Sequence, residues 1–259
     1  MAATLPLETL RQIFSYLEGG LAPYSCVCGQ WQLAAEQLTF ASLHINSVDL
    51  EDFRQIAFSS HSVSRCFHLR RIDLKVVIPE YSVAARGRYE NQNDRDGNSK
   101  VFTQAITSLF EILSSWPDAD RHQISLQIYA NSPSDWEAET DRTVRRIRLQ
   151  RCYAFPKEEL LHRRYERSYL QLTEVPLPNV KCITSLKVLG YGKYRNILPG
   201  SVSEMVARLP RLDTLNVEIR DRLRRGAAAS DSLDGKLYRL PLFSFSKIST
   251  GSNSVNRFP

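Results

Sequence analysis

The chain has 259 residues, 42% of them hydrophobic, with 34 Lys and Arg against 28 Asp and Glu and a net charge of +6. This composition is typical of a folded globular protein with room for one small module and one larger domain. The modest charge does not favour a nucleic-acid partner. No apolar run approaches the ~20 residues that span a bilayer, and no secretory signal is evident, so we expect no membrane association. The five scattered cysteines indicate reduced thiols and a cytoplasmic or nuclear location.

The first part of the chain predicts three short helices. Four apolar residues at i, i+3, i+7 and i+10 form one stripe of the first helix: Leu7, Leu10, Phe14 and Leu17. Pro6 suits the opening turn of this helix, and Gly19-Gly20 is expected to end it. A second short helix is predicted to begin near Leu21, and a third to run from about residue 28 to 38. Helices this short bury too little surface for a good independent core, so we expect them to share an apolar face with something else.

This arrangement resembles an F-box over roughly residues 4 to 45. The resemblance rests on three features: Leu5-Pro6, the stripe of Leu10, Ile13, Phe14 and Leu17, and Val27-Cys28 followed by Trp31. Gly29 departs from the family, which usually has a basic residue before the tryptophan. The alternative interpretation is an amphipathic N-terminal helix packed on the body of the protein.

The resemblance implies that the module docks a Skp-type adaptor, which links it to a cullin–RING ubiquitin ligase, while the rest of the chain recruits a protein substrate. The adaptor-binding residues that it implies are Leu5, Pro6, Leu7, Leu10, Ile13, Phe14, Leu17, Val27 and Trp31.

A loose apolar pattern recurs after residue 40 and predicts strands. The matching triplets are Phe40/Leu43/Ile45, Leu69/Ile72/Leu74, Val144/Ile147/Leu149, Ile183/Leu186/Val188 and Leu212/Leu215/Val217, with Ile124/Leu126/Ile128 as an alternating variant. The first two and the last two are each 29 residues apart, at the upper end of leucine-rich-repeat periods.

Helices are predicted between these strands. The cleanest amphipathic helix covers residues 102 to 113, with Asn98 or Ser99 expected to cap it after a polar loop at residues 90 to 99. Ser201-Val202-Ser203-Glu204 fits a capping box that opens another helix, and residues 49 to 58 are a weaker candidate.

We therefore predict an α/β fold with three parts. A three-helix F-box module spans residues 1–45, an irregular leucine-rich-repeat-like strand/helix solenoid spans residues 46–222, and a poorly ordered tail spans residues 223–259. The chain is similar to fungal F-box proteins, which often contain degenerate repeats of this kind. A non-repetitive α/β domain is the alternative.

Motifs for enzyme chemistry are missing from the sequence. There is no Gly-x-Ser-x-Gly elbow, no His-Glu-x-x-His and no P-loop, so we expect no catalysis, metal or cofactor.

The acidic residues from Asp135 to Asp141 are interpreted as a solvated turn. The basic stretch from Arg142 to Arg167 is interpreted as a solvated face, with an acidic-substrate surface as the alternative.

The expected function is substrate recognition for a ubiquitin ligase. Polar and aromatic candidates for the substrate-facing side of the strands fill gaps in the apolar pattern: His44, Asp73, Gln127, Tyr129, Arg148 and Lys187. The alternative, which we favour for most of them, is that they are simply solvated strand residues. The alternative function is a basic α/β nucleic-acid-binding protein, or another interaction protein without a ligase.

Overall fold

The computed structural model describes residues 5–17, 19–58, 66–85, 88–116, 122–135, 164–165, 168–173, 175–190 and 194–219. Its helices are α1 (Leu7–Ser15), α2 (Gly29–Thr39), α3 (Leu50–Phe58), α5 (Gln92–Ser114) and α9 (Pro199–Ala207), with short 3-10 helices η1 (Ala22–Cys26), η2 (Ser47–Asp49) and η3 (Val83–Ala85). Its strands are β1 (Ser42–Asn46), β2 (Arg71–Val77), β3 (Ile124–Asn131), β4 (Ile183–Gly190) and β5 (Thr214–Ile219). The expected mixture of helices and strands is confirmed.

The strands form one sheet in the order β1-β2-β3-β4-β5, and every neighbouring pair is parallel. Parallel neighbours need crossover connections, which α3, α5 and α9 supply between β1 and β2, β2 and β3, and β4 and β5. The apolar triplets stack in register across all five strands. One column is Leu43, Ile72, Leu126, Leu186 and Leu215, and the next is Ile45, Leu74, Ile128, Val188 and Val217.

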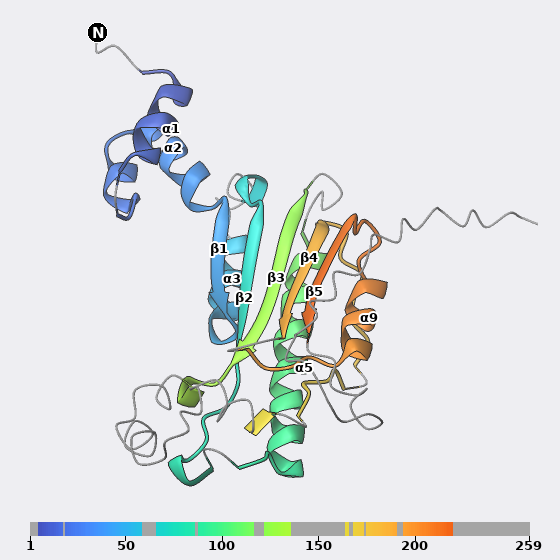
Figure 1. Cartoon of the computed structure of the whole chain (residues 1–259). Coiled ribbons are helices and arrows are strands. Elements are labelled where there is room, and N and C mark those ends of the chain that lie inside the picture. The colour runs from blue at the N-terminus through green and yellow to red at the C-terminus, as the bar shows by residue number, and fades with distance from the viewer. Residues whose placement is uncertain are drawn as a thin grey trace, which may run out of the picture.

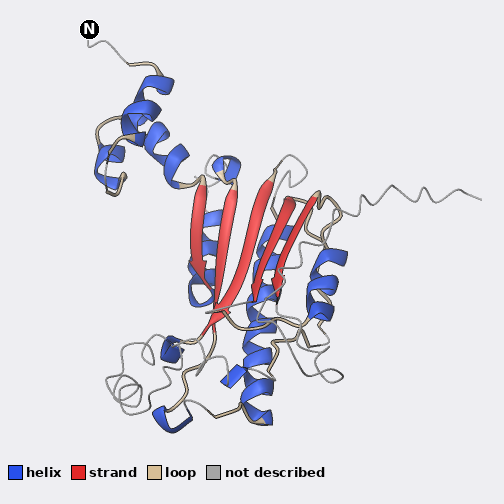
Figure 2. Cartoon of the chain, viewed as in Figure 1, coloured by secondary structure: helices blue, strands red, loops and turns tan. Residues whose placement is uncertain are grey.

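Helices cover one face of this sheet (Figures 1 and 2). Successive strand side chains point to opposite faces, so the two apolar columns face the helices. Phe53 of α3, Leu109 of α5 and Met205 of α9 pack with them in one apolar core.

The opposite side of the sheet is called the open face below. It is formed by the alternate strand residues Ser42, His44 and Asn46, Arg71, Asp73 and Lys75, Ser125, Gln127 and Tyr129, Ser185, Lys187 and Leu189, and Thr214, Asn216 and Glu218. Almost all of these side chains are polar, as expected for a face that no described helix covers.

The N-terminal helices stand apart from the sheet (Figure 1). They have their own apolar core, separate from the core under the sheet. The boundary between the two cores falls at about residue 41, because β1 is a strand of the sheet and Ile45 lies in the larger core. The last four residues of the expected 1–45 module therefore belong to the larger domain.

Three predicted helix limits were wrong. Helix α1 ends at Ser15, before the glycines; Gly19 instead adopts a positive φ of 109° in the following turn. The polar segment from Gln92 onward is the start of α5 rather than a loop, and Asn91 caps it, not Asn98 or Ser99. Helix α9 begins at Pro199, so Ser201 is inside it and does not cap it.

Several expectations fall outside the described residues. They are the strand at residues 144–149, the candidate Arg148, the basic stretch except Arg164, and the tail from residue 223.

Candidate protein-interaction site

The N-terminal module is built around a small apolar core. Leu10 and Phe14 of α1 face Ala34 and Ala35 of α2, and these four residues are buried. Leu10 and Phe14 are an i, i+4 pair and share one face of α1, and the small side chains of Ala34 and Ala35 let the two helices approach closely.

Three aromatic rings complete this core. Phe14 meets Trp31 edge-on at 5.3 Å between ring centroids, and Tyr24 of η1 lies 5.6 Å from Phe14. Edge-to-face contacts of this kind add to the stabilisation from burial. Trp31 therefore serves mainly to tie η1 and α2 to α1.

Other apolar side chains of the module point to solvent. Five of them are exposed: Leu5, Ile13, Tyr16, Val27 and Leu33. Val27 is 60% exposed and Tyr16 is 76% exposed, so both leave apolar surface that a partner would bury. Leu5 precedes α1, Ile13 lies on its exposed side and Tyr16 follows its last residue, while Val27 lies between η1 and α2 and Leu33 lies on α2.

The structure thus divides the expected adaptor-binding residues into two groups. Leu5, Pro6, Ile13 and Val27 are exposed, and Leu7, Leu17 and Trp31 are partly exposed. Leu10 and Phe14 lie in the module's own core, so in this structure they cannot contact a partner directly, and we correct their role from contact to support. Tyr16 and Leu33 are further exposed apolar side chains of the module that the sequence analysis did not single out, because they lie outside the main apolar stripe.

The module joins the sheet through one short connection. Helix α2 ends at Thr39 and β1 begins at Ser42, so only Phe40 and Ala41 lie between them. The carbonyl of Ala41 accepts hydrogen bonds from the backbone N–H groups of Arg70 (2.9 Å) and Arg71 (3.0 Å), which fixes this connection to the start of β2.

His68 lies at the same junction. Burial, with help from the positive charges of Arg70 and Arg11, lowers the pKa of this histidine, while Glu36 opposes the shift. Arg11 and Glu36 belong to α1 and α2, so the charge of His68 depends on how the module sits against the body.

Ion pairs link the polar side chains of the open face. Asp73 is buried, and it accepts a hydrogen bond from Arg71 Nε at 2.8 Å and lies 3.2 Å from His44 Nδ1. Lys187 pairs with Glu218 at 3.1 Å. The expected substrate-facing residues His44, Asp73, Gln127, Tyr129 and Lys187 therefore lie together on one face.

A buried polar cluster lies beyond the carboxyl ends of the strands. Glu90 accepts hydrogen bonds from Arg195 Nη2 at 2.7 Å and Asn98 Nδ2 at 2.9 Å, and also from the Ser168 hydroxyl. Arg195 stacks over the Tyr165 ring at 3.9 Å. These contacts connect Glu90, just before α5, to Ser168 and to Arg195, which is 105 positions later in the sequence.

Asp135 forms the second half of this cluster. Its carboxylate accepts hydrogen bonds from the hydroxyls of Tyr81 (2.7 Å) and Tyr165 (2.5 Å) and from the N–H of Ser132 (2.8 Å). Burial, together with this carboxylate, raises the pKa of both tyrosines, so they remain hydrogen-bond donors. The expectation of a solvated turn was therefore wrong for Asp135, which is buried and fully engaged.

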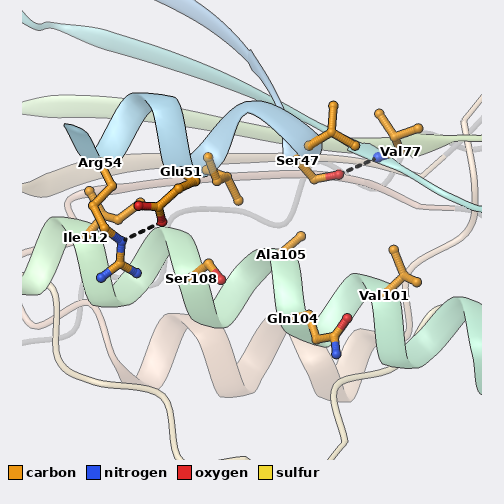
Figure 3. A pocket seen from close by; sticks show the side chains of 11 residues that line it. Ser47, Glu51, Arg54, Val77, Val101, Gln104, Ala105, Ser108 and Ile112 are labelled. Carbon is orange, nitrogen blue, oxygen red and sulfur yellow. Dashed lines mark hydrogen bonds and ion pairs between the residues drawn. The ribbon is translucent and has the colours of Figure 1, made fainter. Parts of the chain in front are cut away.

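Two of the pockets on the described surface are lined by charged side chains. The larger, about 310 Å³, lies between η2, α3 and α5 (Figure 3). Arg54 lines this pocket, and its guanidinium is already paired with Glu51 at 3.4 Å and Glu111 at 3.5 Å. The smaller, about 190 Å³, opens beside Glu90 and Arg164.

Within the described residues, no three His, Cys, Asp or Glu side chains gather as a metal site would require. The cysteines described are free: Cys26 and Cys28 are exposed, whereas burial raises the pKa of the Cys182 thiol to about 12. No described helix is long and apolar enough to cross a membrane.

No protein-family model matches the chain, and no curated protein matches its sequence.

Proposed function

We propose that this chain is the substrate-recognition subunit of a Skp–cullin–F-box type ubiquitin ligase. The observation that supports the proposal best is the N-terminal module, which has its own small core and keeps five apolar side chains at its surface. An apolar surface of this kind suits docking against a helical partner, with a few large side chains supplying most of the binding energy.

The sheet supports the second half of the proposal. Five parallel strands in sequential order, with two apolar columns in register, are what a leucine-rich-repeat-like solenoid requires. The open face of such a solenoid is the side on which we place the protein substrate.

The proposed subunit catalyses nothing itself. Its contribution is proximity, because it raises the effective concentration of a substrate lysine near the ligase-bound partners. The short connection at Ala41 helps here, since a hydrogen-bonded two-residue link keeps the module in a defined direction relative to the sheet.

The test measures binding of the purified chain to a purified Skp-type adaptor. Ile13→Glu and Val27→Glu each place a charge on the proposed surface without entering the module's core. We expect the double variant to weaken binding by at least about 30-fold, which corresponds to about 2 kcal/mol and to the loss of a binding hot spot.

Val48→Glu is the matched control. Val48 is a valine of η2 that is 72% exposed, so the same substitution there introduces the same charge on the body of the protein. Adaptor binding should be unchanged in this variant. Binding of the Ile13→Glu/Val27→Glu variant at the native affinity would overturn the proposal.

A further inference from the structure

The charges on the open face are unevenly exposed. The face has three Lys and Arg side chains, Arg71, Lys75 and Lys187, and two carboxylates, Asp73 and Glu218. The Arg71 side chain is 52% exposed, whereas that of Asp73 is only 4% exposed and already bound by Arg71 and His44. A partner approaching this face therefore meets cations and a single accessible carboxylate, Glu218, which is itself paired with Lys187.

The rest of the face offers neutral hydrogen-bonding groups. The row that contains Arg71 otherwise consists of hydroxyls, from Ser42, Ser125, Ser185 and Thr214. Tyr129 adds an aromatic surface, because its ring lies 5.0 Å from that of Tyr194. Hydroxyls and tyrosines are common in protein-recognition surfaces, since they offer contact area and hydrogen bonds at little entropic cost.

The distance between the cations indicates how far apart the acidic groups of a partner must lie. Arg71 of β2 and Lys187 of β4 are two strands and two residue positions apart, which separates their backbones by about 12 Å. Acidic side chains four residues apart lie on one face of an extended segment and span such a distance, at about 3.3 Å per residue.

Three cations are few for a nucleic acid. Specific DNA-binding proteins neutralise roughly 6–10 phosphates, and their affinity depends on that number. An acidic polypeptide, which has fewer charges and many backbone hydrogen-bonding groups, fits this face better.

From these observations we infer that the open face binds an extended acidic segment of a protein substrate. This inference rests on the proposed function, since it names the class of substrate that the sheet would recruit. Arg71, Lys75 and Lys187 pair with its carboxylates, while Tyr129 packs against its apolar or backbone groups.

Fluorescence anisotropy of three labelled 12-residue peptides with the full chain tests the inference. One peptide alternates Glu and Ala, one Gln and Ala, and one Lys and Ala. We expect the Glu peptide to bind at least tenfold more tightly than the other two, and its affinity to fall as salt rises.

Substitutions identify the surface. Lys75→Gln combined with Lys187→Gln should weaken binding of the Glu peptide by at least tenfold, and it leaves the Arg71–Asp73 pair intact, so folding is preserved. Lys100→Gln, an exposed lysine on α5, is the matched control and should bind as the native chain does.

Equal affinity for the Glu and Gln peptides would overturn the inference, and so would native affinity in the double variant. Tighter binding of a single-stranded DNA 12-mer than of the Glu peptide would also overturn it and assign the face to nucleic acid. Adaptor binding, measured on the same variants, separates the two proposals: if the Glu peptide fails to bind while the adaptor binds, this inference fails and the proposed function stands.

Discussion

The Glu90–Arg195 pair shows how single residues decide the stability of this protein. Both side chains are buried, and each also contacts Ser168. Removing Arg195 takes away the cation nearest to the buried Glu90 carboxylate and leaves Arg164, 3.8 Å away, to compensate its charge in a medium of low polarity.

We therefore predict that Arg195→Met lowers the free energy of unfolding by about 3–5 kcal/mol. Urea denaturation followed by circular dichroism measures the change. The comparison is Glu218→Gln, which breaks the partly exposed Lys187–Glu218 pair and should cost no more than about 1 kcal/mol. Equal losses in the two variants would contradict the prediction.

The second prediction at this scale concerns His68 and pH. Its folded-state pKa lies below the ordinary value of 6.5, so the unfolded chain binds the proton more readily than the folded one. Stability should therefore fall as the pH drops below about 6.5, until the folded-state pKa is also passed. Burial of the ring is the main cause of this lowered pKa; the charges of Arg70 and Arg11 reinforce it, and that of Glu36 opposes it.

Thermal unfolding at about pH 7.5 and about pH 5.5 measures this dependence, with the histidine titrating between the two. His68→Gln has no charge to gain, so its unfolding temperature should fall less on acidification than that of the native chain. The same drop in both proteins would show that His68 does not contribute.

The sequence identified the amphipathic helix of the module but not which of its apolar side chains are buried and which are exposed. Leu10, Ile13 and Phe14 are all apolar and adjacent on α1, so periodicity alone does not divide them. The division comes from α2, because Ala34 and Ala35 receive Leu10 and Phe14 and leave Ile13 outside. That pairing is a tertiary contact, which a one-dimensional pattern does not contain.

At the scale of elements, strands were easier to predict than helix ends. The apolar alternation located all five described strands, because one face of each strand must be buried against the helices. The missed ends have tertiary causes. The Ser201 hydroxyl, which fits a cap in sequence, instead accepts a hydrogen bond from the N–H of Leu172 at 2.8 Å.

The start of α5 is the clearest case. Its first two turns are polar and lack an amphipathic stripe, since they pack on the buried Glu90 cluster rather than on the apolar core. Arg95 and Asn98 both donate hydrogen bonds to Glu90, one to its carbonyl and one to its carboxylate. A helix that buries polar side chains cannot be recognised from hydrophobic periodicity.

The third prediction tests this helix start. The Asn91 side chain accepts a hydrogen bond from the N–H of Asp94 at 2.8 Å. Asn91→Ala should lower the free energy of unfolding by about 1 kcal/mol, whereas Asn91→Asp keeps an acceptor at the cap and should change it little. Urea denaturation of the three proteins measures both values. Equal stability of all three would mean that the cap adds nothing to this helix.

At the scale of the whole molecule, the chain consists of two cores of very different size. The sheet and its helices share one large core, while the module depends on four buried residues and their neighbours. A small core supplies little stability by itself, so the module should open more readily than the sheet.

The fourth prediction follows from this imbalance. Phe14→Ala removes the ring that contacts both Tyr24 and Trp31, and such core truncations cost about 3–5 kcal/mol. That loss is comparable to all the stability a module of this size can have, so α1 should lose its structure while the sheet remains folded.

Hydrogen exchange resolves the two regions. In the Phe14→Ala variant, the amides of α1 and α2 should exchange rapidly, and those of β2 and β3 should keep their native protection. Phe110→Ala, which truncates a buried ring of α5, is the reciprocal variant and should reduce protection in the sheet. Loss of protection in both regions of Phe14→Ala would mean instead that the junction at Ala41 and His68 couples module and sheet into one cooperative unit, because unfolding of the small core would then destabilise the large one.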